Sequence, residues 1–196
     1  MESWIVPCGI AGASVIATWL VEAKQSVIEN MAPVLTRIFT PLFTVVLVVF
    51  LGAMAFSGRG LGFERSLLIA FDLLLIVVLG LLLYSISARD PQAPRGGFDF
   101  LLVALVLSAL AADGVALATI AQRIGELGST PNRLAALGMN AILFVNLAWS
   151  AVLYLRFLAG RGAFSALERW QMRYLPVFSL WSATVAVVFP LAFGFA

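Results

Sequence analysis

The stretch FLLVALVLSALAADGVALATIA (residues 100–121) decides the fold class, because Asp113 is the one charged residue in it. A helix rises about 1.5 Å per residue, so about 20 apolar residues span a hydrocarbon core roughly 30 Å thick. Backbone groups in lipid must pair within the segment, which a helix achieves. This stretch therefore predicts a transmembrane helix.

Further apolar runs lie on both sides of it. The chain of 196 residues is 62% apolar and 11% charged, with a mean hydropathy of +1.05. Soluble domains are about 45–50% apolar and about 25% charged, so a soluble globular domain and a disordered chain are both excluded. We predict an all-α polytopic transmembrane bundle, a single membrane domain over residues 1–196. Six spans are expected, at residues 4–21, 38–56, 67–86, 100–121, 134–158 and 175–196, or five if the first run, which contains Pro7, does not span.

Missing residue types exclude several kinds of site. The chain has no histidine and one cysteine, Cys8, so a His-based triad, a His metal site and an internal disulfide cannot form. No nucleophile–base pair or set of metal ligands is evident, which makes a lipid-modifying enzyme the weakest function class. We expect no cofactor and, because the basic residues are scattered, no nucleic-acid partner.

The distribution of Lys and Arg predicts the orientation in the membrane. One set of connections and helix ends holds Lys24, Arg37, Arg89, Arg95, Arg156, Arg161, Arg169 and Arg173, and the other holds Arg59, Arg65, Arg123 and Arg133. The more basic side is normally cytoplasmic. The count therefore places both termini outside the inner membrane of a bacterium.

Three polar residues interrupt the expected spans and are the candidates for a functional site. Asp72 and Asp113 are ionisable, and an Asp at a helix centre costs about 2.5–3.5 kcal/mol on insertion. With a rise of about 1.5 Å per residue, Asp72, Asp113 and Asn140 each lie about 7–12 Å below the same predicted face. Arg65 and Arg133 each precede one of them by nearly two helical turns and could snorkel at the rim.

Two interpretations of this polar cluster are open. It could lock the third, fourth and fifth spans together, with an Asp protonated or paired to Arg. Alternatively, it could form a proton- or cation-responsive site or the wall of a polar pathway. The second interpretation predicts a permease-like or envelope-associated membrane component, and the first predicts a scaffold or assembly subunit that does not transport.

Small and polar residues predict where helices meet. A small-xxx-small pattern in the fourth span allows close approach of another backbone, and it consists of Ala104, Ser108, Ala112 and Ala116. Asn146 and Ser150 in the fifth span could bond across helices. Expected partners are the lipid bilayer and, beyond it, other membrane subunits or a second copy of the chain.

The segment SALERWQMRY (residues 165–174) predicts a short interfacial amphipathic helix. Ser165 and Glu168 have the spacing of a capping box. Trp and Tyr favour the headgroup level and Arg meets anionic lipid there, which marks Arg169, Trp170, Arg173 and Tyr174 as lipid-contacting candidates. In the polar loop at residues 88–99, between the third and fourth expected spans, Asp99 is placed to cap the next helix.

The segment GSTPNR (residues 128–133) predicts the start of the fifth span. Ser129 or Thr130 can cap it, and Pro131 suits the first turn. Arg133 opposes the helix dipole in that turn, so a carboxylate partner such as Asp113 or Glu126 is expected.

The same segment resembles a Thr-Pro-x-Arg-like turn before a late transmembrane helix in a bacterial family of uncharacterised polytopic inner-membrane proteins. The phrases SVIENMAPVL (26–35), FTPLF (39–43), YLP (174–176) and FP (189–190) are similar to parts of that pattern. The resemblance implies a membrane location and a match to the C-terminal membrane portion of longer members. It implies no catalytic residues.

Overall fold

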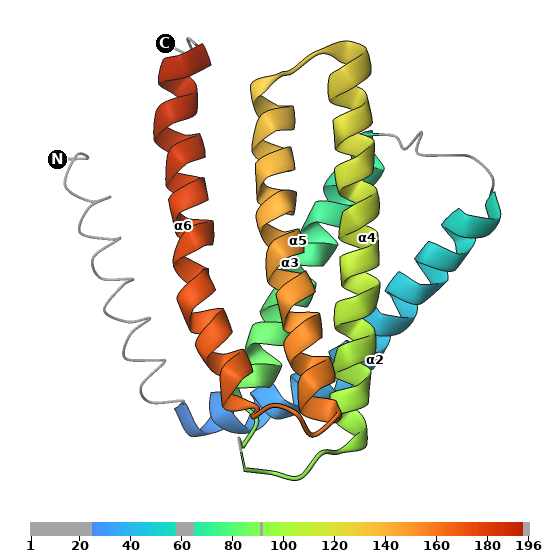
Figure 1. The fold of residues 1–196 in the computed structure, drawn as a ribbon, viewed down its shortest axis with the longest axis vertical. Coiled ribbons are helices and arrows are strands. Elements are labelled where there is room, and N and C mark those ends of the chain that lie inside the picture. Colours follow the sequence, from blue (N-terminus) through green and yellow to red (C-terminus); the bar gives the residue numbers. More distant parts are fainter. Residues whose placement is uncertain (1–24, 58–64, 91, 194–196) are drawn as a thin grey trace, which may run out of the picture. The chain divides into compact units, whose positions relative to one another are not determined.

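The computed structural model describes residues 25–57, 65–90 and 92–193, and their regular structure is helical throughout. The helices are α2 Gln25–Ser57, α3 Arg65–Ser87, α4 Gly97–Leu127, α5 Pro131–Leu158 and α6 Ser165–Phe193 (Figure 1). The predicted all-α class is confirmed. The chain forms two compact units, residues 1–37 and 38–196, and the description below concerns the second. The predicted first span at 4–21 lies outside the described residues.

The structure supports four membrane spans, and the predicted six are not supported. Among the described residues, four helical segments are long and apolar enough to cross a membrane, namely Thr36–Phe56, Gly97–Leu127, Pro131–Leu158 and Ser165–Phe193. The described apolar part of α3, Asp72–Ser87, is shorter. These helices are consistent with an integral membrane protein in contact with lipid.

The predicted interfacial helix at 165–174 is not a separate element. Its residues form the first turns of α6, which continues through Pro176 and Pro190 to Phe193. The segment from Ser165 to Tyr174 lacks glycine and proline, so nothing ends the helix before the apolar run begins. Proline inside a membrane helix is tolerated because neighbouring groups satisfy the freed carbonyls.

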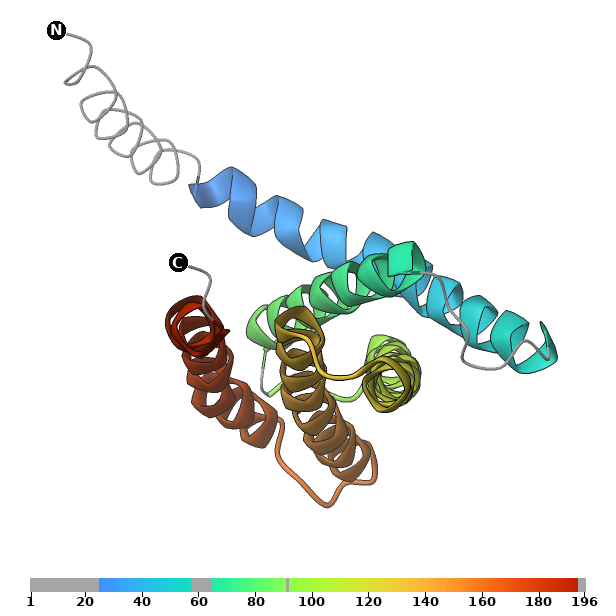
Figure 2. The ribbon, with the colours of Figure 1, turned by 90° about the horizontal axis from the view of Figure 1, so that it is seen from above.

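The core lies around α4 and α5. Helix α4 packs against α5 and α3, and α6 packs against α5 and α3. Seen from above, α5 lies between α4 and α6 (Figure 2). Buried residues from all five described helices form one cluster that includes Leu47, Leu82, Leu105, Leu147 and Leu167. This packing fixes α3, α4 and α5 side by side.

The small-residue pattern of α4 is only partly a packing face. Ser108, Ala112 and Ala116 are buried, whereas Ala104 is exposed. An α-helix repeats every 3.6 residues, so a spacing of four drifts around the axis and carries the first residue off the buried face.

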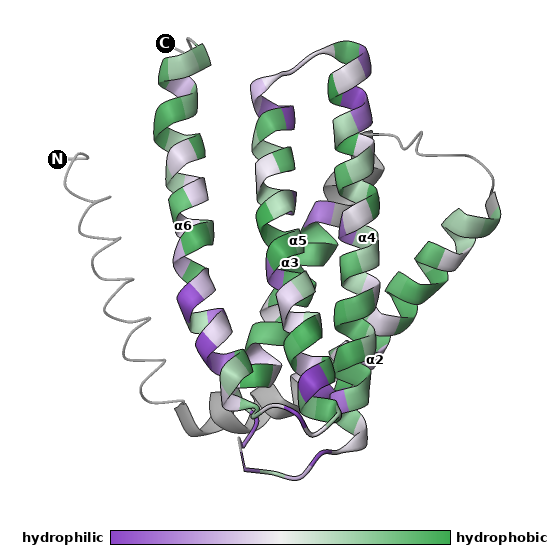
Figure 3. Cartoon of the chain, in the orientation of Figure 1, coloured by the Kyte–Doolittle hydropathy of each residue, from purple (hydrophilic) through white to green (hydrophobic). Residues whose placement is uncertain are grey.

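Apolar residues dominate the coloured part of α2 and most of α6, whose first turns carry polar residues (Figure 3). Val49, Phe56, Leu180 and Leu191 are exposed between 63% and 93%, although each is a large hydrophobic residue. Exposed apolar area on this scale fits a protein whose solvent is lipid.

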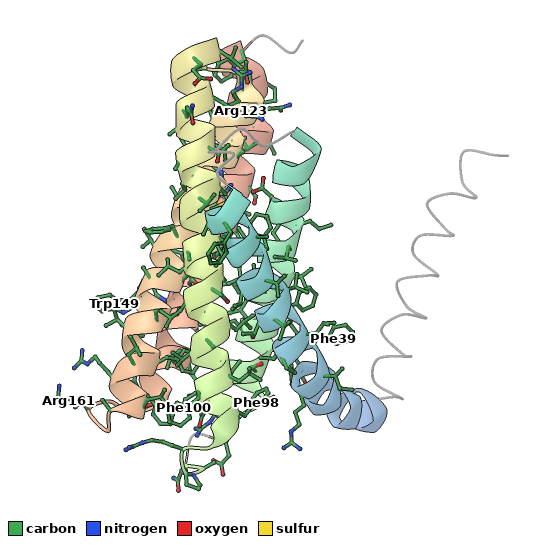
Figure 4. All side chains as sticks on the ribbon, turned by 90° about the vertical axis from the view of Figure 1, so that its right-hand side faces the viewer. Phe39, Phe98, Phe100, Arg123, Trp149 and Arg161 are labelled. Atoms are coloured by element: carbon green, nitrogen blue, oxygen red, sulfur yellow. The ribbon has the colours of Figure 1, made fainter. Side chains whose placement is uncertain are left out.

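The connections alternate between two ends of the bundle. The α3–α4 and α5–α6 connections lie at one end and the α4–α5 connection at the other (Figure 1). Arg161 and Arg123 mark these opposite ends in Figure 4. The connections at that shared end hold Arg89, Arg95 and Arg161 of the more basic set, so it is the basic end of the bundle.

Candidate functional site

The polar centre contains a direct bond between α3 and α5. Asn140 Nδ2 donates a hydrogen bond of 3.0 Å to Asp72 Oδ1. Asn140 is buried, and Asp72 is half-buried. The structure thus brings together two of the three polar residues that interrupt the predicted spans.

Asp113 lies in the core beside this pair without joining it. Its side chain on α4 is 0% exposed. Within the described part of the chain, neither carboxyl oxygen has a hydrogen-bond partner. Because an unpaired buried carboxyl is costly, Asp113 is the least satisfied group of the described bundle core.

A cavity of about 420 Å³ opens beside the Asp72–Asn140 pair. Residues of α3, α5 and α6 line it. Its lining is apolar except for three side chains, those of Asp72, Asn140 and Ser182. The lining residues are Asp72, Ile76, Leu79, Ala135, Ala136, Met139, Asn140, Leu143, Phe178, Trp181, Ser182, Val185 and Ala186.

One aromatic wall of the cavity depends on a glycine. Trp181 Nε1 donates to the Ala135 carbonyl oxygen at 3.2 Å. A Cβ atom added at Gly138 would overlap the Trp181 ring. The glycine therefore admits the indole against the backbone of α5 and sets its position at the cavity.

The two arginines predicted at the rim have different outcomes. Arg133 does not pair with Asp113 or Glu126, because its Nη1 donates to the carbonyl oxygens of Leu127 at 3.2 Å and Gly128 at 2.7 Å. The C-terminal carbonyls of α4 carry partial negative charge and replace the expected carboxylate. The side chain of Arg65, the first residue of α3, lies outside the described side chains.

The start of α5 follows its local signals. Thr130 caps the helix by accepting from the Arg133 backbone N–H at 3.4 Å, and Pro131 occupies the first turn. This turn sets the register of α5, and hence the height of Asn140 beside Asp72.

A second polar cluster joins α5 to α6. Asn146 Nδ2 donates to Gln171 Oε1 at 3.0 Å, and Gln171 Nε2 donates to Ser150 Oγ at 2.8 Å. All three side chains are buried. The prediction that Asn146 and Ser150 bond across helices is confirmed, and Gln171 is the partner.

The lipid-contacting candidates divide between two faces of α6. Arg169 and Arg173 are exposed. Trp170 and Tyr174 turn to α5, where they donate to the carbonyl oxygens of Asn146 at 3.4 Å and Ile142 at 2.8 Å. The aromatic pair therefore packs helices together, and the arginines remain available to lipid.

Arg89, at the basic end of the bundle, makes both charged and aromatic contacts. Arg89 binds Asp99 through two bonds, Nε to Oδ1 at 2.9 Å and Nη2 to Oδ2 at 3.0 Å. Its guanidinium also lies over the rings of Phe164, at 4.5 Å, and Phe157, at 4.9 Å. Asp99 accepts from the Gly96 backbone N–H at 2.9 Å, so it caps α4 from the third helical position. These contacts tie the α3–α4 connection to the α5–α6 connection at the basic end.

Sequence reasoning did not identify Trp181, Phe178 or Gly138 as parts of the site. A glycine and aromatic residues in apolar runs carry no local signal of a cavity, since their contacts depend on how α5 and α6 pack. Within the described residues, no group of His, Cys, Asp and Glu could hold a metal ion.

The chain matches no protein-family model, no curated protein and no solved structure at a significant level.

Proposed function

We propose that the chain is a permease-like integral membrane protein in which Asp72, Asn140 and Asp113 form the polar step of a pathway for a cation. The observation that carries this proposal is that Asp72, held by Asn140, lines a cavity with otherwise mostly apolar walls. Ionisable residues inside membrane segments usually mark ion or substrate pathways.

The electrostatics of the site favour a positively charged ligand. A carboxylate in a medium of low dielectric constant is stabilised by a counter-charge or by a proton. Asp113, with no partner in the described structure, adds a second acid beside it. A cation or proton that reaches the Asp72 carboxylate in the cavity neutralises its charge, which gives the site a reason to bind such a ligand.

The membrane and orientation are part of the same proposal. We assign the protein to the inner membrane of a bacterium with both termini outside. Support comes from the basic residues gathered at the end of the α3–α4 and α5–α6 connections, because such residues are normally cytoplasmic. We also propose that the chain belongs to the bacterial inner-membrane family that has a Thr-Pro-x-Arg-like turn. The support for this membership is the similarity of GSTPNR (residues 128–133) and the other short motifs to that family's pattern.

Cation flux into proteoliposomes tests this proposal. The purified chain should admit protons or monovalent cations, reported by an enclosed dye, and both Asp72→Asn and Asp113→Asn should abolish the flux. Asp90→Asn is the matched control, because Asp90 is exposed in the α3–α4 connection. Unchanged flux in both membrane variants, or no flux in the parent chain, would reject the permease assignment.

A non-transporting scaffold or assembly subunit is the second candidate. The exposed apolar faces of α2 and α6 favour it, since other subunits could cover them instead of lipid. Purification in a mild detergent separates the two functions. A stoichiometric membrane partner, together with absent flux, would establish the scaffold.

A further inference from the structure

We infer that the cavity between α3, α5 and α6 is a binding site for an organic cation with an apolar or aromatic body. This inference deepens the proposed function by naming the class of ligand. It rests on the proposed function in one respect, namely that the cavity is a functional site. Three properties of the cavity support this inference: the charge of its lining, the apolar and aromatic side chains of its walls, and its volume.

The charge of the lining has one sign. Among the described residues that line the cavity, Asp72 is the only charged one, and none is Lys or Arg. Asn140 occupies Oδ1 of that carboxylate. Among the described residues, Asn140 is the one hydrogen-bond donor to this carboxylate, which leaves Oδ2 to meet a ligand. A carboxylate in such surroundings favours a cation and rejects an anion.

The walls select an apolar body. Leu79, Met139 and Leu143 supply aliphatic surface, and Phe178 and Trp181 supply aromatic rings. Aromatic faces attract cations as well as burying hydrocarbon, most strongly for organic ammonium groups. A small hydrated inorganic ion would leave this apolar lining unused, whereas an arylalkyl ammonium would cover it.

The size of the cavity agrees with this class. A volume of about 420 Å³ falls within the range of roughly 300–1,000 Å³ typical of small-molecule sites. Gly138 maintains this volume on the α5 side by letting the Trp181 ring lie close to the backbone. The indole N–H is engaged with the Ala135 carbonyl, so the ring is held in place for a ligand to contact.

Equilibrium dialysis of the purified full chain in detergent tests the inference with three probes. Benzyltrimethylammonium carries both the charge and the aromatic body, tetramethylammonium lacks the body, and benzenesulfonate has the opposite charge. We expect the first to bind about tenfold or more tightly than either of the others. Equal affinity for the anion, equal affinity for tetramethylammonium, or no binding of the first probe would overturn the inference.

Two pairs of variants locate the site. Asp72→Asn keeps an acceptor for Asn140 but removes the charge, and should weaken benzyltrimethylammonium binding about tenfold or more, whereas Asp90→Asn should not. Gly138→Ala should also weaken it by displacing Trp181, while Gly80→Ala, with open space around its added Cβ, should not. If Asp72→Asn fails to fold, the glycine pair still decides. Parent-like binding in folded Asp72→Asn or in Gly138→Ala would exclude this cavity.

The result also separates this inference from the proposed function. Selective binding without any flux would retain the ligand site and reject the permease. Cation flux that depends on Asp72, without benzyltrimethylammonium binding, would do the reverse.

Discussion

Asn140 on α5 donates a hydrogen bond of 3.0 Å to Asp72 on α3, although 68 residues separate them in the chain. The bond joins α5, which begins at the Thr130 cap, to α3. Helices α4 and α6 also pack against α3. It also orients the carboxylate at the cavity wall.

Asn140→Ala should lower the free energy of unfolding by about 1–2 kcal/mol, because it removes the donor from a half-buried carboxylate. Denaturant titration in detergent measures the change. Asn132→Ala is the control, since Asn132 is exposed at the start of the same helix and should change stability by about 0.5 kcal/mol or less. Equal effects of the two variants would show that the bond contributes nothing.

Asp113→Ala should raise the free energy of unfolding by about 1–3 kcal/mol, because it deletes a buried carboxyl that has no hydrogen-bond partner in the described structure. Asn146→Ala, at an equally buried position with its amide bonded, should lower it by a similar amount. The same titration compares them. If Asp113→Ala were less stable than the parent chain, the carboxyl would have a stabilising partner, and the prediction would be wrong. If the variant were more stable but had lost cation flux, the carboxyl would be linked to function.

Gln171→Ala should destabilise the α5–α6 packing by about 2 kcal/mol, since Asn146 and Ser150 would both lose a buried partner. Gln122→Ala provides the comparison, because Gln122 bonds Glu126 at an exposed position of α4. Thermal unfolding followed by circular dichroism is the measurement. Similar midpoints for the two variants would refute the role given to the buried amide.

Arg89→Lys should loosen the basic end of the bundle, because lysine cannot make the two-bond contact with Asp99 while stacking on Phe157 and Phe164. Hydrogen exchange of the backbone amides at residues 88–99 should accelerate, with a loss of stability of about 1–2 kcal/mol. Arg161→Lys, at an exposed position of the next connection, should leave that exchange unchanged. Exchange that stays slow in Arg89→Lys would contradict the prediction.

Local signals predicted much of the helix layout. Apolar runs located α3, α4 and α5, and GSTPNR identified the start of α5. The same signals failed at residues 165–174, where an amphipathic pattern suggested a separate helix. The α6 structure is continuous there, because amphipathicity reports which face is polar and not where a helix ends. The polar candidates were found because an Asp or Asn in an apolar run is a strong exception.

The sequence by itself determined that this chain is helical and suited to a membrane, because long apolar segments in lipid must satisfy their backbone groups internally. Only the tertiary structure decided the partners. It bonded Asn140 to Asp72, left Asp113 unpaired among the described residues and placed Trp181 on Gly138. These contacts depend on the rotation and packing of helices that are distant in the chain, and no local pattern encodes them.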